Sequence, residues 1–274
     1  MSFKYTFSIV TVCYNAGSCI EKTVQSIMLQ DCNDFEYIIV DGLSKDDTVE
    51  KVKKSEYGFN GRMKIISEKD NGLYDAMNKG ISNAEGEYLI FINADDELCP
   101  NILSKVKETI SSRKEMPDII YGDSINVYYD GNKQATKVRH SYPKITCNTL
   151  KKGMGVVHQS IFTKKTLFDR IGTFNIEYSI GADWDFLIRC VKDNATMLYI
   201  PVPVCKFPTD GVSSTNHALQ RHKIRKSNKL YRIIDFQMAK DVLEPAYVLQ
   251  FLIGNDKYNK VRYHINRYKL KNTD

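Results

Sequence analysis

Residues 88–96 read YLIFINADD, an apolar run that stops at two adjacent carboxylates. Every position from 88 to 92 is apolar, which is typical of a strand buried on both faces. Three similar apolar runs precede it, at residues 7–13, 36–40 and 63–66. Strands of this kind belong to a parallel sheet that is covered by helices on both faces.

Helical patterns separate these four strands. They cover residues 19–30, a segment that starts near 45–48, and residues 73–82. The alternation predicts an α/β fold of the Rossmann-like kind, with a mostly parallel central sheet and helices on both faces. Ligands of such sheets bind at the carboxyl ends of the strands, so the polar residues that follow each strand are expected to meet at one edge.

The pattern changes after residue 96. Helices are predicted at 100–113, 164–171 and 182–193, and strands at 119–129, 133–140 and 160–162. Residues 197–207 are extended, and two or three helices follow from about residue 216. No linker is visible before residue 215, so we predict one domain over 1–215 and a C-terminal helical appendage over 216–274.

The composition is that of an ordinary soluble globular protein, with 42% hydrophobic and 26% charged residues. The N-terminus does not resemble a signal peptide, and no apolar run approaches the ~18 residues of a membrane span. Seven cysteines show no metal-binding spacing. We therefore expect a cytoplasmic protein with reduced thiols, in which Cys13 and Cys190 lie in the core.

The positive charge is concentrated at the C-terminus. Residues 217–274 contain 13 Lys and Arg against 5 Asp and Glu, a net charge of +8. The whole chain has 39 Lys and Arg and 33 Asp and Glu, so the rest of the chain has 26 basic and 28 acidic residues, a net charge of −2. Basic residues interspersed with aromatic ones predict peripheral contact with an anionic membrane, at its inner face. A solvated helical face explains the same pattern.

Polar residues at the strand ends suggest a nucleotide site. Thr11 and Asn15 end the first strand, and Asp41 ends the second, where it could accept a hydrogen bond from a base. Asn71 opens a helix, whose N-terminus favours phosphate. The acidic residues 95–97 follow a buried strand and suggest a hard divalent cation, Mn²⁺ or Mg²⁺. The alternative is an acidic helix N-terminus ahead of Pro100.

Four stretches occur together in order. They are SIVTVCYN at 8–15, IVDGLSKDDT at 39–48, DNGLYDAMNKG at 70–80 and FINADDEL at 91–98. With these motifs the chain resembles the inverting family 2 glycosyltransferases of the GT-A fold, over roughly residues 6–215. The resemblance implies a hexosyl- or N-acetylhexosaminyl-transferase that uses a nucleotide diphosphate sugar, UDP by default. Its polysaccharide-assembly members are the most similar, which implies a saccharide or lipid-linked saccharide acceptor. Residues 1–98 would hold the donor and 99–215 the acceptor.

The resemblance also implies donor-binding residues. The family's Asp-x-Asp-Asp motif corresponds to residues 93–96, and Asp95 takes the position that usually ligates the metal. Asn93 replaces the first carboxylate, so the resemblance leaves metal dependence open. Met77 stands where many members have Arg. The implied donor-binding residues are Thr11, Tyr14, Asn15, Asp41, Glu68, Asn71, Asn78, Asn93, Ala94 and Asp95.

On the acceptor side, Asp183 matches the general base, which removes the proton of the attacking hydroxyl. Spacing alone also fits a helix N-cap for Asp183. Trp184 is either a platform for the acceptor sugar or a core residue. His158 and Gln159 are expected near the acceptor and the donor sugar. His217 could reach the metal or the diphosphate.

Two other functional classes were considered. A nucleotidyltransferase-like enzyme would need a glycine-rich basic loop after the first strand, where this chain has the sequence YNAG at 14–17. A non-catalytic nucleic-acid-binding module would need basic residues over a folded surface, and the net charge of −2 outside the tail argues against it. We therefore expect no nucleic-acid partner.

Overall fold

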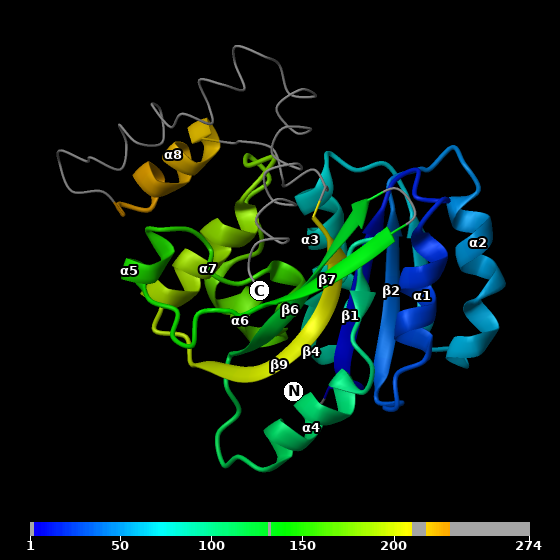
Figure 1. The fold of residues 1–274 in the computed structure, drawn as a ribbon, viewed down its shortest axis with the longest axis horizontal. Coiled ribbons are helices and arrows are strands. Elements are labelled where there is room, and N and C mark those ends of the chain that lie inside the picture. Colours follow the sequence, from blue (N-terminus) through cyan, green and yellow to red (C-terminus); the bar gives the residue numbers. More distant parts are fainter. Residues whose placement is uncertain (1–2, 131–132, 210–217, 231–274) are drawn as a thin grey trace. The chain divides into compact units, whose positions relative to one another are not determined.

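The computed structural model describes residues 3–130, 133–209 and 218–230 (Figure 1). The chain divides into two compact units, residues 1–207 and 208–274. In the second unit the described element is helix α8 (Ala218–Ser227). The predicted boundary at 215/216 and His217 lie outside the described residues, so the predicted division into a catalytic domain and an appendage stays a prediction.

The first unit is built on one sheet. Among the described residues this sheet has nine strands, in the order β3-β2-β1-β4-β8-β6-β9-β5, with β7 paired to β6. The strands are β1 (Tyr5–Cys13), β2 (Phe35–Asp41), β3 (Met63–Ser67), β4 (Gly86–Phe91), β5 (Glu97–Leu98), β6 (Ile119–Asp130), β7 (Lys133–Arg139), β8 (Ile161–Lys164) and β9 (Met197–Pro208).

The helices connect and cover these strands. They are α1 (Ile20–Met28), α2 (Thr48–Lys54), α3 (Leu73–Asn83), α4 (Ile102–Ser111), α5 (Cys147–Leu150), α6 (Lys165–Ile171) and α7 (Ala182–Lys192), with short 3₁₀ helices η1 (Glu56–Phe59) and η2 (His158–Ser160). The predicted α/β Rossmann-like architecture is confirmed. Element boundaries differ from the predicted ones by a few residues.

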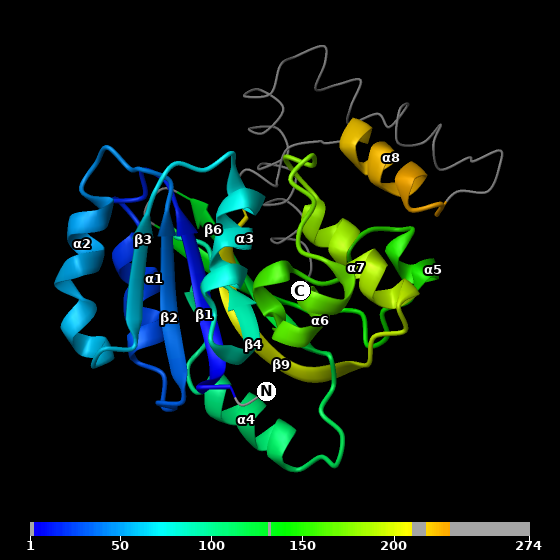
Figure 2. The same cartoon turned by 180° about the vertical axis from the view of Figure 1, so that it is seen from behind.

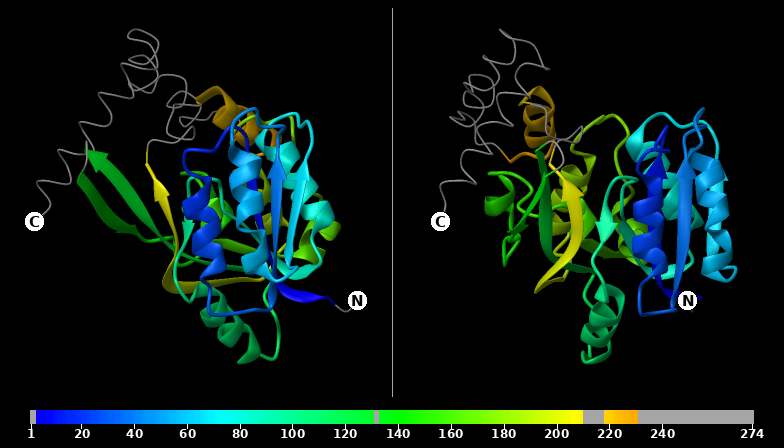
Figure 3. Two further views of the ribbon diagram at one scale, coloured as in Figure 1. Left: turned by 90° about the vertical axis from the view of Figure 1, so that its right-hand side faces the viewer. Right: turned by 45° about the vertical axis from the view of Figure 1, so that its right-hand side comes forward.

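The sheet is mixed, with a parallel and an antiparallel part. β1 pairs in parallel with β2 and β4, and β2 pairs in parallel with β3. All seven positions of β2 are buried, as expected for a strand covered on both faces. β8 pairs antiparallel with β4 and with β6, which joins the strands of the second half to the first. In the left view of Figure 3 the β6–β7 hairpin points away from β1 and β2.

Opposite faces of the parallel strands are covered by different helices. Figures 1 and 2 show α1 and α2 on one face and α3 on the other. α1 buries Ile20, Val24 and Ile27 at helical spacing. α3 lies very close to β1, because a Cβ at Gly80 would collide with the side chain of Val10. The glycine in the NKG end of the 70–80 motif is therefore required for this close helix–sheet contact.

The carboxyl ends of the parallel strands share one edge, as the sequence predicted. Backbone hydrogen bonds continue across this edge beyond the strands themselves. The Gly42 amide donates to the Cys13 carbonyl at 2.9 Å, and the Glu68 amide donates to the Asp41 carbonyl at 3.0 Å. The Ile92 amide donates to the Val10 carbonyl at 2.9 Å. The segments that follow β1, β2, β3 and β4 therefore lie side by side.

Two cysteines lie where the sequence predicted them. All seven cysteines are free thiols, and Cys13 and Cys190 are buried as predicted. Across residues 3–130, 133–209 and 218–230, none of the helices combines the length and the apolar character that a membrane span requires.

Candidate active site

The segments after β1 and β2 are locked together by side chains of the two motifs. Asn15 has a left-handed backbone with φ of 50°. Its amide donates to Ser44 Oγ at 2.8 Å, and its Oδ1 accepts from the Lys45 amide at 2.8 Å. The Ala16 amide donates to Thr48 Oγ1 at 2.8 Å. The 39–48 motif thus fixes the shape of the loop that the sequence assigned to the nucleoside.

Asp41 ends β2 at the expected edge, but its carboxylate is buried and already accepts hydrogen bonds. Ser44 donates to it from both its amide and its hydroxyl, and Ser67 Oγ donates at 2.7 Å. Thr11 is also fully buried, and its Oγ1 accepts from the Tyr37 hydroxyl at 3.0 Å. These two buried side chains therefore support the strand ends from within.

Other groups form the surface of this sheet edge. Tyr14 is 58% exposed, so its ring is available to a ligand. Gly42 lies between that ring and the carboxylate of Asp70, because a Cβ at position 42 would be 3.5 Å from the Tyr14 ring and would collide with Asp70. The ends of β1, β2 and β3 are thus brought together around Gly42, an arrangement that suits a flat base beside an aromatic ring.

Carboxylates of Asp70 and Asp75 hold the turn that leads into α3. Gly72 has φ of 113°, and its amide donates to Asp70 Oδ1 at 2.9 Å. Asn71 donates to Asp75 Oδ2 from its amide at 2.9 Å and from its side chain at 3.2 Å. Glu68 forms an ion pair with Lys79 at 2.9 Å. A phosphate at this helix end would therefore replace internal carboxylate contacts.

The three acidic residues after β4 do not gather at one point. Asp95 is exposed, whereas Asp96 is buried and accepts from the Gln159 side chain at 2.7 Å. Glu97 pairs with Lys206 on β9 at 3.8 Å. Burial, and then the charge of Asp95, raise the pKa of Asp96 to about 7. The expectation that a cation holds three carboxylates together is not met, because β5 begins at Glu97 and turns its side chain toward β9.

Two further atoms mark the donor side. Asn93 Oδ1 is buried and has no hydrogen-bond partner among the described residues, while the Ala94 carbonyl accepts from Thr23 Oγ1 at 2.8 Å. In the described part of the chain, no three His, Cys, Asp or Glu side chains form a group that could hold a metal ion. His217 lies outside that part.

Asp183 lies in the first turn of α7, whose N-cap is Gly181 in a left-handed conformation. Its Oδ1 accepts from the Tyr74 hydroxyl at 2.9 Å and from the Trp184 amide at 2.9 Å. Its Oδ2 lies 3.4 Å from His158 Nδ1. Burial alone would raise the pKa of Asp183, but the contacts with His158 and Tyr74 outweigh burial and lower it below the usual value of 3.8. Asp183 is therefore ionised at neutral pH.

His158 and Asp183 both line a small, mostly apolar cavity, which also contacts Phe91, Met154, Phe174 and Phe186. The contact with Asp183 favours a proton on His158 Nδ1. Nε2 is buried and has no hydrogen-bond partner among the described residues. The predicted His158–Gln159 pair is thus split, with His158 beside Asp183 and Gln159 beside Asp96.

Two of the expected site residues have structural contacts. Trp184 is 5% exposed, and its indole N–H donates to the Leu150 carbonyl at 3.2 Å, so it packs in the core. A role of Trp184 in acceptor binding stays a prediction. Asn78 binds the backbone of Phe174 through both ends of its amide, at 2.9 and 3.0 Å. Asn78 thereby fastens α3 to the segment that precedes α7.

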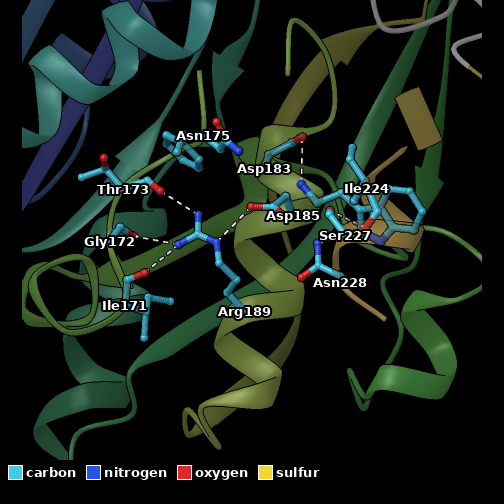
Figure 4. A network of polar contacts seen from close by, with 12 residues as sticks. Ile171, Gly172, Thr173, Asn175, Asp183, Asp185, Arg189, Ile224, Ser227 and Asn228 are labelled. Atoms are coloured by element: carbon cyan, nitrogen blue, oxygen red, sulfur yellow. Dashed lines mark hydrogen bonds and ion pairs between the residues drawn. The ribbon is translucent and has the colours of Figure 1, made fainter. Parts of the chain in front are cut away.

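A second network holds α7 in place (Figure 4). The Arg189 guanidinium pairs with Asp185 at 2.9 Å and donates to the carbonyls of Ile171, Gly172 and Thr173 at 2.7, 3.2 and 2.6 Å. Asp185 therefore has a structural contact within α7. The loop that Arg189 holds leads directly to Phe174.

Sequence reasoning missed three residues at this edge. Ser44 and Ser67 hold Asp41, and Tyr74 holds Asp183. Ser44 had a visible signal, since a serine three residues after an aspartate suits a local side-chain turn. Tyr74 stands inside the 70–80 motif, but it lies 109 residues from Asp183 in the sequence.

Three features are typical of a GT-A glycosyltransferase. They are the parallel strands β1 to β4, the polar edge at the carboxyl ends of these strands, and the carboxylate of Asp183 on α7. The family model described as "Glycosyl transferase family 2" matches residues 8–172, and the chain belongs to this family. The PGL/p-HBAD biosynthesis glycosyltransferase of Mycobacterium bovis (strain BCG / Pasteur 1173P2) is 34% identical over 212 residues, covering 76% of this chain and 79% of that protein.

Solved structures share the fold. TarS 1–349 from S. aureus, in complex with UDP-GlcNAc, has a TM-score of 0.64 at 19% identity and covers 90% of this chain and 73% of that one. The mannosyltransferase PcManGT from Pyrobaculum calidifontis, in complex with GDP-Man and Mn²⁺, has a TM-score of 0.61 at 15% identity. It covers 98% of this chain and 81% of that one. The predicted GT-A fold is therefore confirmed.

Proposed function

We propose that this glycosyltransferase moves a hexosyl or N-acetylhexosaminyl group from a UDP-sugar to a saccharide hydroxyl, with inversion at the anomeric carbon. The observation that carries the proposal is the position and state of Asp183. It is a carboxylate, 16% exposed, in the first turn of a helix, and its neighbours keep it ionised at neutral pH. An ionised carboxylate in this setting is suited to act as a general base.

In the reaction, the proton of the acceptor hydroxyl passes to an oxygen of Asp183. The acceptor oxygen forms a bond to the anomeric carbon as the bond from that carbon to the diphosphate oxygen breaks. One displacement inverts the configuration, and it needs one base on the acceptor side. His158 Nε2, which has no hydrogen-bond partner among the described residues, could form a hydrogen bond with a second hydroxyl of the acceptor.

The donor is assigned to the edge formed by the ends of β1, β2 and β3. The exposed Tyr14 ring supplies a stacking surface for a base. The nucleobase could hydrogen-bond to the Asp41 carboxylate if Ser44 or Ser67 gives up its own hydrogen bond to that carboxylate. TarS, which shares the fold, is described in complex with UDP-GlcNAc, which supports UDP as the first nucleotide to test.

A divalent cation, Mn²⁺ or Mg²⁺, could bind between side-chain oxygens of the protein and the phosphates of the donor. Mg²⁺ is commonly held by one or two carboxylates together with substrate phosphates. The exposed Asp95 and the partnerless Asn93 Oδ1 provide oxygen atoms for that arrangement. When bound, the cation would neutralise charge on the diphosphate leaving group. PcManGT, described in complex with Mn²⁺, supports testing this ion first.

The setting in the cell is proposed from charge and from the relative's name. Residues 217–274 have a net charge of +8 from 13 basic and 5 acidic residues, which favours the inner face of an anionic membrane. The mycobacterial relative is named for PGL/p-HBAD biosynthesis, which supports a biosynthetic role here, in surface polysaccharide assembly. Full-length protein should sediment with vesicles of anionic lipid, and protein ending at residue 216 should not. Equal sedimentation would refute the membrane contact.

The reaction is tested with a donor screen. UDP-, GDP- and dTDP-sugars are incubated with the full-length protein and Mn²⁺, with water or simple glycosides as acceptors, and release of nucleoside diphosphate is followed. We expect release from one UDP-sugar and a loss of about 10²–10⁴-fold in Asp183→Asn. Asp185→Asn is not a suitable control because it breaks the Arg189 pair, whereas Asp31→Asn removes an exposed carboxylate elsewhere. Full activity of Asp183→Asn would refute the assigned base.

A further inference from the structure

The hydroxyl of Tyr74 forms two hydrogen bonds that determine where its own proton points. The Gly181 amide donates to the hydroxyl oxygen at 3.0 Å, and the hydroxyl lies 2.9 Å from Asp183 Oδ1. A backbone N–H can only donate, so the oxygen accepts from Gly181 and the proton is directed at the carboxylate. One hydroxyl thus contacts both the N-cap of α7 and the first acidic residue of that helix.

We propose that Tyr74 is the positioning residue for the base: its hydroxyl holds the Asp183 carboxylate in one orientation for proton transfer. This inference rests on the proposed function and adds a residue to it. Tyr74 belongs to α3, the helix that follows the donor-side loop, and not to the acceptor half of the chain. The base is therefore held from the donor half.

The Tyr74 ring has little freedom to move. It is 6% exposed and packs against Phe174, with ring centroids 5.7 Å apart. Phe174 is itself fixed to α3 through the two hydrogen bonds of Asn78. A buried ring held at both the helix and the neighbouring aromatic side chain places its hydroxyl with the accuracy that an oriented base requires.

The remaining neighbours of Asp183 in the described part of the chain do not substitute for this contact. His158 Nδ1 approaches the other oxygen, Oδ2, at 3.4 Å, which is long for a strong hydrogen bond. On the same helix, Asp185 pairs with Arg189, which points to the 171–173 loop. Without the Tyr74 hydroxyl, Oδ1 would keep only the Trp184 amide, which belongs to the adjacent residue.

The test is a double-mutant cycle between Tyr74→Phe and Asp183→Asn, measured as UDP release from the most active UDP-sugar with Mn²⁺. A positioning residue acts through the group that it positions, so its effect should vanish when that group is removed. We expect Tyr74→Phe to lower kcat by roughly 10-fold in the wild-type background, the size expected for a hydrogen bond to a charged group. In the Asp183→Asn background the change should be below about 2-fold.

Tyr88→Phe is the matched control. Tyr88 is also buried, and its hydroxyl donates to a backbone carbonyl, that of Pro117, at 2.6 Å. It should leave kcat unchanged in both backgrounds. The affinity for UDP, measured by calorimetry, should be the same in Tyr74→Phe and in the wild type. Incorporation of 4-fluorophenylalanine at position 74 fills the space of the hydroxyl without a donor, and it decides the matter if the Phe variant does not fold.

The outcomes distinguish a failure of the Tyr74 inference from a failure of the proposed function. An equal loss from Tyr74→Phe with and without the Asp183 carboxylate would show a merely structural role and overturn the inference. Weaker UDP binding with unchanged kcat would also overturn it, because Tyr74 would then serve the donor. If the wild-type protein releases no nucleoside diphosphate from any donor, the proposed function and the inference fall together.

Discussion

Asp96 gives the structure a pH dependence of stability that can be worked out in advance. Its carboxyl is 2% exposed, and burial together with the charge of Asp95 raises its pKa to about 7. In the unfolded chain an Asp titrates near 3.9. The folded state therefore binds this proton more tightly than the unfolded state, and stability from this group increases as the pH falls through 7.

The magnitude follows from the two pKa values. Between pH 8 and pH 6 the unfolded carboxyl stays ionised, while the folded one becomes largely protonated. Linkage then gives a gain of about 1.4 kcal/mol in the free energy of unfolding for a folded pKa of about 7. In Asp96→Asn this gain should disappear, because an amide keeps an acceptor for the Gln159 side chain but does not titrate.

The assay is urea unfolding at pH 6, 7 and 8 in EDTA, with the wild type, Asp96→Asn and the exposed-site control Asp31→Asn. The difference between pH 6 and pH 8 should be about 1.4 kcal/mol larger in the wild type and in Asp31→Asn than in Asp96→Asn. A wild-type protein whose stability does not increase toward pH 6, relative to Asp96→Asn, would show that Asp96 is ionised in the folded state and would refute the reasoning.

Three other predictions concern packing and the donor side. Gly80→Ala should lower the free energy of unfolding by about 1–3 kcal/mol, because the added Cβ collides with the Val10 side chain. Chemical denaturation measures this change, and an unchanged midpoint would contradict the close contact between α3 and β1. Asn78→Ala should cost about 1–3 kcal/mol, because the buried Phe174 backbone loses both partners; Ser82→Ala, on the same helix, serves as control. Asp95→Ala should abolish the stimulation of UDP release by Mn²⁺. Its melting temperature should stay within about a degree or two of the wild type, because the Asp95 side chain is exposed. If Mn²⁺ still stimulates the variant, Asp95 is not a ligand of the metal.

The parallel part of the fold was predictable because its signals are local. The apolar runs of β1, β2 and β4 and the intervening helices are readable within windows of ten residues, and the rule for carboxyl ends then placed Asp41 and Asp95 at one edge. The family motifs added the nucleotide site and the fold. The sequence also placed Cys13 and Cys190 in the core correctly, but not Cys32, Cys99 and Cys205, which are buried too.

The rest of the site depends on distant pairings and on the direction of side chains. Asp95 and Asp96 are neighbours in sequence, yet one is exposed and the other is buried against Gln159. The short strand β5 pairs with β9 more than a hundred residues later, and no local pattern predicts that pairing. The same holds for Tyr74, whose partner Asp183 lies on a helix that enters the structure only after β8 and α6.

The placement of α3 has a consequence for which changes of length the chain can accept. Tyr74 and Asn78 are four residues apart, so one face of the helix carries both contacts toward the α7 region, and Gly80 must face β1. One residue inserted between 74 and 78 would turn the following part of the helix by about 100° and separate the Tyr74 contact from those of Asn78 and Gly80. The β6–β7 hairpin points away from β1 and β2 in Figure 3, and no helical spacing of contacts constrains its length. Relatives of this chain should therefore differ in length at that hairpin and keep the spacing within α3 constant.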